Sequence, residues 1–203
     1  MSSTTSPGPS DDGTAPEPES PQLRIAALRA ELEATADRGR QAVLQYEIGH
    51  LTEQALGDET AAVREYLAAY NLDPEFRPPL IALVSIFERR RSSKNLLRLY
   101  DAEARSATAP REAASALADR AVAMADLQGE AEEARQLLES AFEQAAEAGD
   151  IALLLEHELL AAGERSAARR VIEARADLLR NPVLSTLLRL EVARGKEEEG
   201  DVD

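Results

Sequence analysis

The stretch GDETAAVREYLAAYNLDP, residues 57–74, decides the fold, because both ends of a helix are marked in it. Asp58 can accept backbone N–H bonds as an N-cap residue, and Pro74 prevents the helix from continuing. The residues between them that recur at steps of three and four, and so share one helix face, are Ala62, Val63, Tyr66, Ala69 and Tyr70. One helix cannot bury such a face alone, so the stretch predicts further helices packed against it.

The same residue types recur along the chain with a period near 34 residues. Steps of 34 from Tyr66, with one four-residue insertion, reach large apolar residues: Leu32, Tyr66, Tyr100, Leu138 and Ile172. Four positions before each stand Leu28, Ala62, Leu96, Ala134 and Ala168. The turn positions that precede four of these helices are Gly57, Arg91, Gly129 and Gly163. A period of this length with helical spacing inside it is typical of stacked helical hairpins.

The stretch 57–74 resembles the second half of a tetratricopeptide repeat. The turn, small, aromatic, small and proline positions of that motif are Gly57, Ala62, Tyr66, Ala69 and Pro74. The resemblance covers about residues 22–195 and is weakest over 77–106. It implies an all-α, right-handed α-solenoid of about four helical hairpins with a capping helix at each end. An irregular helical bundle is the alternative.

The positions of proline, glycine and the apolar residues predict where each helix begins and ends. An opening helix is expected over 22–36 and a closing helix over 183–194. The hairpins are expected over 38–56 with 58–73, 77–90 with 93–106, 111–127 with 131–147, and 151–162 with 165–179. We expect the closing helix to have one polar face, which protects the open end of such an array. Tyr66 is expected to be buried between neighbouring hairpins.

Both ends of the chain are predicted to be disordered. Residues 1–21 are Ser, Thr, Pro, Gly and acidic residues with almost nothing apolar, so ordering them would cost about 1–2 kcal/mol each without burial in return. The segment is either a solubilising leader, or a tether or a site for phosphorylation at Ser6 or Ser20. Residues 196–203 form an acidic tail that is too polar to pack.

Composition argues against several classes of function. The formal net charge of −15 argues against nucleic acid as a partner, because phosphate contacts need clustered Lys and Arg. The chain has no cysteine, which excludes thiol chemistry and cysteine metal sites. It has no apolar run long enough for a membrane span, and its first residues lack a signal-peptide pattern. We therefore expect a cytoplasmic protein without membrane insertion.

The sequence shows no pattern of catalytic or metal-binding residues. Its two histidines, His50 and His157, lack a partner at ligand spacing, and the string LLEHELL around His157 lacks the second histidine of a zinc-protease motif. There is no Gly-rich phosphate loop and no nucleophile elbow. We expect no enzymatic activity, no catalytic residue, no metal and no cofactor.

The resemblance implies a binding groove, because the first helix of each tetratricopeptide hairpin lines a concave face. The residues that this places in the groove are Tyr46, His50, Glu53, Ile81, Ser85, Asp119, Leu153 and His157. Relatives that hold the C-terminal carboxylate of chaperones use Lys and Asn there, where this chain has Tyr46, His50 and Ser85. That class of ligand is therefore not expected, and Tyr46 is the predicted main anchor for a partner.

A basic cluster is the second candidate surface, and its residues are Arg89, Arg90, Arg91, Lys94 and Arg98. It is either a solvated helix end or a docking patch for an acidic segment, including the chain's own GKEEEGDVD. Taken together, the sequence predicts a non-enzymatic scaffold or adaptor that binds a peptide or helix of another protein in the groove. The alternatives are a structural subunit that self-associates and an enzyme that uses the repeats as a scaffold.

Overall fold

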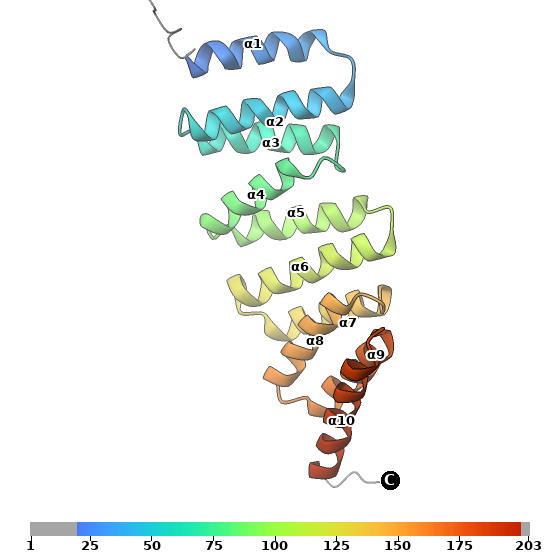
Figure 1. The fold of residues 1–203 in the computed structure, drawn as a ribbon. Helices are drawn as coiled ribbons and strands as arrows, with labels where there is room; N and C mark the ends of the chain where they lie inside the picture. The colour runs from blue at the N-terminus through green and yellow to red at the C-terminus, as the bar shows by residue number, and fades with distance from the viewer. Residues whose placement is uncertain (1–19, 200–203) are drawn as a thin grey trace, which may run out of the picture. The chain divides into compact units, whose positions relative to one another are not determined.

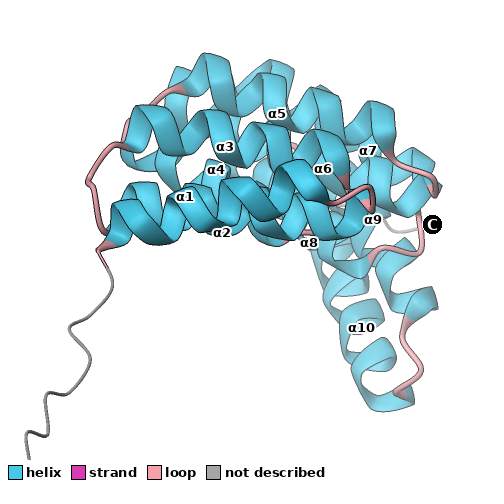
Figure 2. Cartoon of the chain, turned by 90° about the horizontal axis from the view of Figure 1, so that it is seen from above, coloured by secondary structure: helices cyan, strands magenta, loops and turns pink. Residues whose placement is uncertain are grey.

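A computed structural model of the chain describes residues 20–199, and all regular structure within this range is helical, with short loops and no strand (Figure 1, Figure 2). The ten helices of this range are α1 (Pro21–Ala34), α2 (Arg38–Gln54), α3 (Glu59–Leu72), α4 (Pro78–Arg89), α5 (Ser93–Ser106), α6 (Pro110–Gln128), α7 (Ala131–Gln144), α8 (Gly149–Ala161), α9 (Arg165–Leu178) and α10 (Pro182–Glu199). The predicted all-α class is confirmed. Predictions for residues 1–19 and 200–203 lie outside the described residues.

A boundary between Leu83 and Val84, within α4, divides these helices into two compact units. In the first unit, α1 packs on α2 and α2 on α3. In the second unit, each helix from α5 to α10 packs on the next one in the chain, and α6 also contacts α8.

Four turns share one backbone geometry. Among the described residues, positive φ angles occur at Gly57 (69°), Arg91 (50°), Gly129 (72°) and Gly163 (80°), the four turn positions expected from the sequence period. In each turn the following residue donates its N–H to a carbonyl five or six positions back, as in Ser92 to Phe87 (2.8 Å) and Glu164 to Leu159 (2.8 Å). This bond satisfies an otherwise unpaired carbonyl at the end of the preceding helix.

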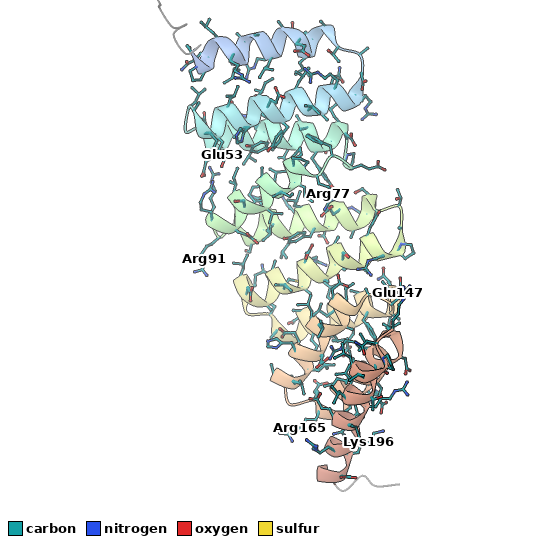
Figure 3. The ribbon with its side chains drawn as sticks, viewed as in Figure 1. Glu53, Arg77, Arg91, Glu147, Arg165 and Lys196 are labelled. Atoms are coloured by element: carbon teal, nitrogen blue, oxygen red, sulfur yellow. The ribbon has the colours of Figure 1, made fainter. Side chains whose placement is uncertain are left out.

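The predicted helix ends lie within three residues of the observed ones, except at the end of the chain. At the start of α3, Asp58 accepts the N–H of Ala61 at 2.9 Å, which confirms it as the N-cap residue. The closing helix was predicted to end at Arg194, but α10 continues to Glu199. Polarity prevents packing but not helix formation, because Lys and Glu are good helix formers. Residues 196–199 are thus helical. Lys196, which is labelled in Figure 3, pairs with Glu173 of α9 at 3.0 Å.

The prediction of a polar outer face for α10 is also wrong. Its inner face packs on α9, with Val192 buried and the Ser185 hydroxyl donating to the Ala176 carbonyl at 2.8 Å. The large apolar residues that α10 leaves exposed are Val183, Leu184, Leu187 and Leu190. The last helix therefore presents apolar side chains on both sides.

Tyr66 is at the centre of the core of the first unit. It is fully buried, as predicted, together with Ala62 and Ala69 on the same face of α3. Its burial between neighbouring hairpins stays a prediction, because the contacts described below are with α2 of the same hairpin. Its hydroxyl donates to Glu53 Oε2 of α2 at 2.8 Å, and Glu53 is labelled in Figure 3. The ring lies directly against Gly49 of α2. The small residues on both helices give the tyrosine its space.

The core of the second unit is rich in alanine. Its buried residues come from α6 to α9 and are Ala114, Ala118, Ala121, Met124, Ala134, Leu138, Ala141, Ala145, Ala148, Ile151, Ala152, Leu155, Leu159, Ala168 and Val171. Alanine adds little bulk beyond the backbone, so neighbouring helices approach closely and fix the faces that remain exposed.

Candidate functional site

The eight predicted groove residues divide equally between the two units. Those in the first unit are Tyr46, His50, Glu53 and Ile81, and those in the second are Ser85, Asp119, Leu153 and His157. Two of these side chains, those of Tyr46 and Glu53, are half-buried. The other six are exposed.

In the first unit Tyr46 belongs to a cluster of rings. Its ring centroid lies 6.1 Å from that of His50, 5.6 Å from that of Tyr66 and 5.7 Å from that of Phe76. Such pairs contribute roughly 0.5–1.5 kcal/mol each beyond the area they bury. Tyr46 therefore supports the fold around Tyr66, so its replacement is expected to lower stability as well as any binding.

The second unit contains a cavity of about 690 Å³. This volume lies within the usual range of ligand pockets, roughly 300–1,000 Å³. The lining residues come from the end of α4 and its turn, from α5, from α6 and from α8, and are Glu88, Arg91, Leu96, Tyr100, Asp119, Val122, Ala123, Asp126, Leu127 and Leu154. The cavity is thus lined both by Asp119, which was predicted for the groove, and by Arg91, which belongs to the basic cluster.

Helix α6 supplies half of this lining, from residues that lie at helical spacing along the side of the helix that faces the cavity. Asp119, Val122 and Asp126 stand at steps of three and four and so follow one face of the helix. Leu96 and Tyr100, one turn apart on α5, are buried beneath the cavity. The site therefore combines a buried apolar floor with exposed carboxylates.

The electrostatics of the cavity are negative. Three carboxylates, Glu88, Asp119 and Asp126, line it together with one guanidinium, that of Arg91. Burial and, to a smaller extent, the nearby negative charges of Asp119, Glu88 and Glu103 together raise the pKa of Tyr100 to about 12. The phenol is therefore protonated at neutral pH and can donate a hydrogen bond within the cavity.

The basic cluster lies at the end of α4 and the start of α5. Its five side chains are exposed, and Arg91 projects at the turn between these helices (Figure 3). Cations are favoured beside the exposed carbonyls at a helix C-terminus, which accounts for Arg89 and Arg90. Arg91 differs from the others because it lines the cavity.

Residues 20–199 contain no group of three or more His, Asp or Glu side chains placed to hold a metal ion. None of the helices in this range is long and apolar enough to span a membrane.

Sequence reasoning missed most of the cavity lining. Asp126 could have been found, because it stands seven residues after Asp119 and therefore on the same helix face. Leu154 lines the cavity, whereas its neighbour Leu153, which was predicted for the groove, does not, because one residue turns a helix by about 100°. The α5 residues Leu96 and Tyr100 were assigned only to packing. Comparison of the chain with protein-family models and with curated proteins finds no match.

Proposed function

We propose that this chain is a non-enzymatic adaptor that binds a peptide or helix of a partner protein in the cavity of the second unit. The observation that carries the proposal is the lining, which combines a buried apolar floor with three exposed carboxylates. Protein grooves bind partner segments through a few apolar pockets together with polar groups that fix orientation. The negative lining favours a segment that carries Lys or Arg beside apolar residues.

The proposal includes a tetratricopeptide-like arrangement of the hairpins, and three observations favour it. Helices α4, α6 and α8, which would be the first helices of successive hairpins, supply seven of the ten lining residues. The contact of α6 with α8 is the contact that stacking of such hairpins requires. The positive φ angles at the four turn positions fit the period near 34 residues.

The proposal is tested by selecting peptides from a displayed random library against the full chain. Counter-selection uses the double variant Asp119→Lys/Asp126→Lys, which reverses two lining charges. We expect the selected peptides to contain Lys or Arg together with large apolar residues, and their affinity to fall by about tenfold or more in that variant.

The matched control is Glu139→Lys/Glu143→Lys, which reverses two exposed charges of α7 outside the lining. It makes the same change in net charge and should leave the affinity unchanged. Equal losses in the two variants would show only a response to overall charge and would contradict a site in the cavity. Selection of acidic peptides that bind the basic cluster would also contradict it.

A further inference from the structure

The outer face of α10 carries a row of exposed apolar side chains, here called the α10 stripe. It consists of Val183, Leu187 and Leu190, which expose 65%, 55% and 57% of their surfaces. Their spacing of four and three residues follows one side of the helix, opposite the side on which Val192 and Ser185 pack against α9. Figure 1 shows α10 as the last helix, next to α9.

The stripe has the form of a helix–helix seam. Apolar residues at such steps let one helix lay side chains between those of another. The exposed face of α1, the first helix, differs from the α10 stripe. After Leu23, the residues at the same helical spacing on this face are the small Ala27, Ala30 and Ala34. Leucines on α10 thus offer apolar surface that α1 does not.

The charges at the ends of α10 are unfavourable for the helix by itself. Arg180 precedes the helix start, where the helix dipole favours negative charge, and the exposed Glu197 stands in the last turn, where it favours positive charge. Lys196, the basic residue of that turn, pairs with Glu173 of α9. A second α10 running in the opposite direction would place each of these charges beside a favourable helix end.

We propose that the α10 stripe is the interface between two copies of this chain, which pair through antiparallel α10 helices. In the register that sets Leu187 against the partner's Leu190, Arg180 stands opposite the partner's Glu197. Two-fold symmetry repeats each of these contacts. The proposal is independent of the cavity, whose lining shares no residue with the stripe.

Other occupants fit the stripe less well. Residues 1–19 and 200–203 contain only Met1 and Val202 as large apolar side chains other than proline, so these segments lack a complementary row. A parallel pair would place Glu197 beside its own equivalent. Pairing of α10 with α1 of another copy would be head-to-tail and would grow into open-ended polymers.

The first test is the oligomeric state of the full chain, measured by sedimentation velocity over a range of concentrations. We expect a monomer–dimer equilibrium, and we expect Leu187→Glu/Leu190→Glu to raise the dimer Kd by at least about tenfold. Leu160→Glu is the matched control, because Leu160 of α8 is 50% exposed and lies outside the stripe. A monomer at every concentration, polymers that grow with concentration, or equal loss in the control would overturn the proposal.

The second test uses the absence of cysteine from the sequence. Chains with Leu187→Cys are mixed with chains carrying Leu190→Cys and are then oxidised. The antiparallel register predicts disulfides between the two kinds of chain in preference to disulfides within either kind. Cross-linking of each variant mainly with itself would indicate a parallel pair and would overturn the proposal. Cross-linking no stronger than that of chains carrying Leu160→Cys would indicate that the α10 stripes do not meet, and it would also overturn the proposal.

Discussion

The ring of Tyr66 occupies the space that a side chain on Gly49 would need. A Cβ atom placed on Gly49 would lie 2.8 Å from both Cδ1 and Cε1 of the ring, closer than carbon atoms approach without displacement. Tyr66 is fully buried and its hydroxyl is bound to Glu53, so the ring has no free direction in which to move. The identity of one residue on α2 is therefore fixed by one residue on α3.

Replacing Gly49 with Ala should destabilise the first unit, although Gly→Ala within a helix normally stabilises by about 1 kcal/mol. Overpacking against the Tyr66 ring is expected to cost about 1–3 kcal/mol and so to reverse that sign. Denaturant unfolding followed by circular dichroism measures the difference. Gly149→Ala is the control, because a Cβ there meets no atom within 4 Å. A gain in stability for Gly49→Ala would contradict the packing described.

Arg91→Gly should stabilise the second unit. Arg91 has a φ of 50°, a left-handed conformation that costs a side-chain-bearing residue roughly 1–2 kcal/mol. The added freedom of glycine in the unfolded chain costs about 0.4–1 kcal/mol, so a net gain of roughly 0.5–1 kcal/mol is expected. Denaturant unfolding provides the measurement, with Gly129→Ala as the inverse control at a φ of 72°. Gly129→Ala should lower the stability. A lower stability of Arg91→Gly would contradict the prediction and show that the Arg91 side chain stabilises the fold by more than its left-handed conformation costs.

Stability should fall as the pH rises from about 10 to about 12. The pKa of Tyr100 is raised in the folded state to about 12, against about 10 in an unfolded chain, so folding favours the protonated phenol. Its contribution is complete below about pH 10 and is lost as the pH rises through the folded-state pKa. Burial raises the pKa of Tyr66 in the same direction.

This pH dependence can be measured by unfolding at several alkaline pH values. Tyr100→Phe should reduce the slope, and Tyr100→Phe/Tyr66→Phe should reduce it further. Ultraviolet absorbance of the phenolate follows the titration directly. An unchanged slope in the double variant would assign the alkaline loss to other groups.

Features fixed by local chemistry could be predicted from the sequence. The turn glycines and Arg91 were found because a left-handed turn repeats at the sequence period, and Tyr66 because its alanine neighbours leave space for one large ring. The all-α class and most helix ends follow from capping residues, prolines and apolar spacing in the same way.

Features that depend on how helices face one another could not be predicted. The choice of Leu154 over Leu153 depends on the rotation of α8 against α6, which no local signal sets. The row of leucines in α10 is visible in the sequence, but whether Val192 or Leu190 faces inward depends on its packing against α9. The same applies to the cavity, whose lining exists only when α4, α5, α6 and α8 are placed together.

The packing of most helices on a neighbour in the chain has a consequence for how this protein folds during synthesis. Within each unit the principal contacts join consecutive helices, and only the contact of α6 with α8 skips one. Contacts between segments close in sequence need little loop closure, and chains dominated by them fold in microseconds to milliseconds. Synthesis adds roughly 5–20 residues per second, so each hairpin has time to form before the next has left the ribosome.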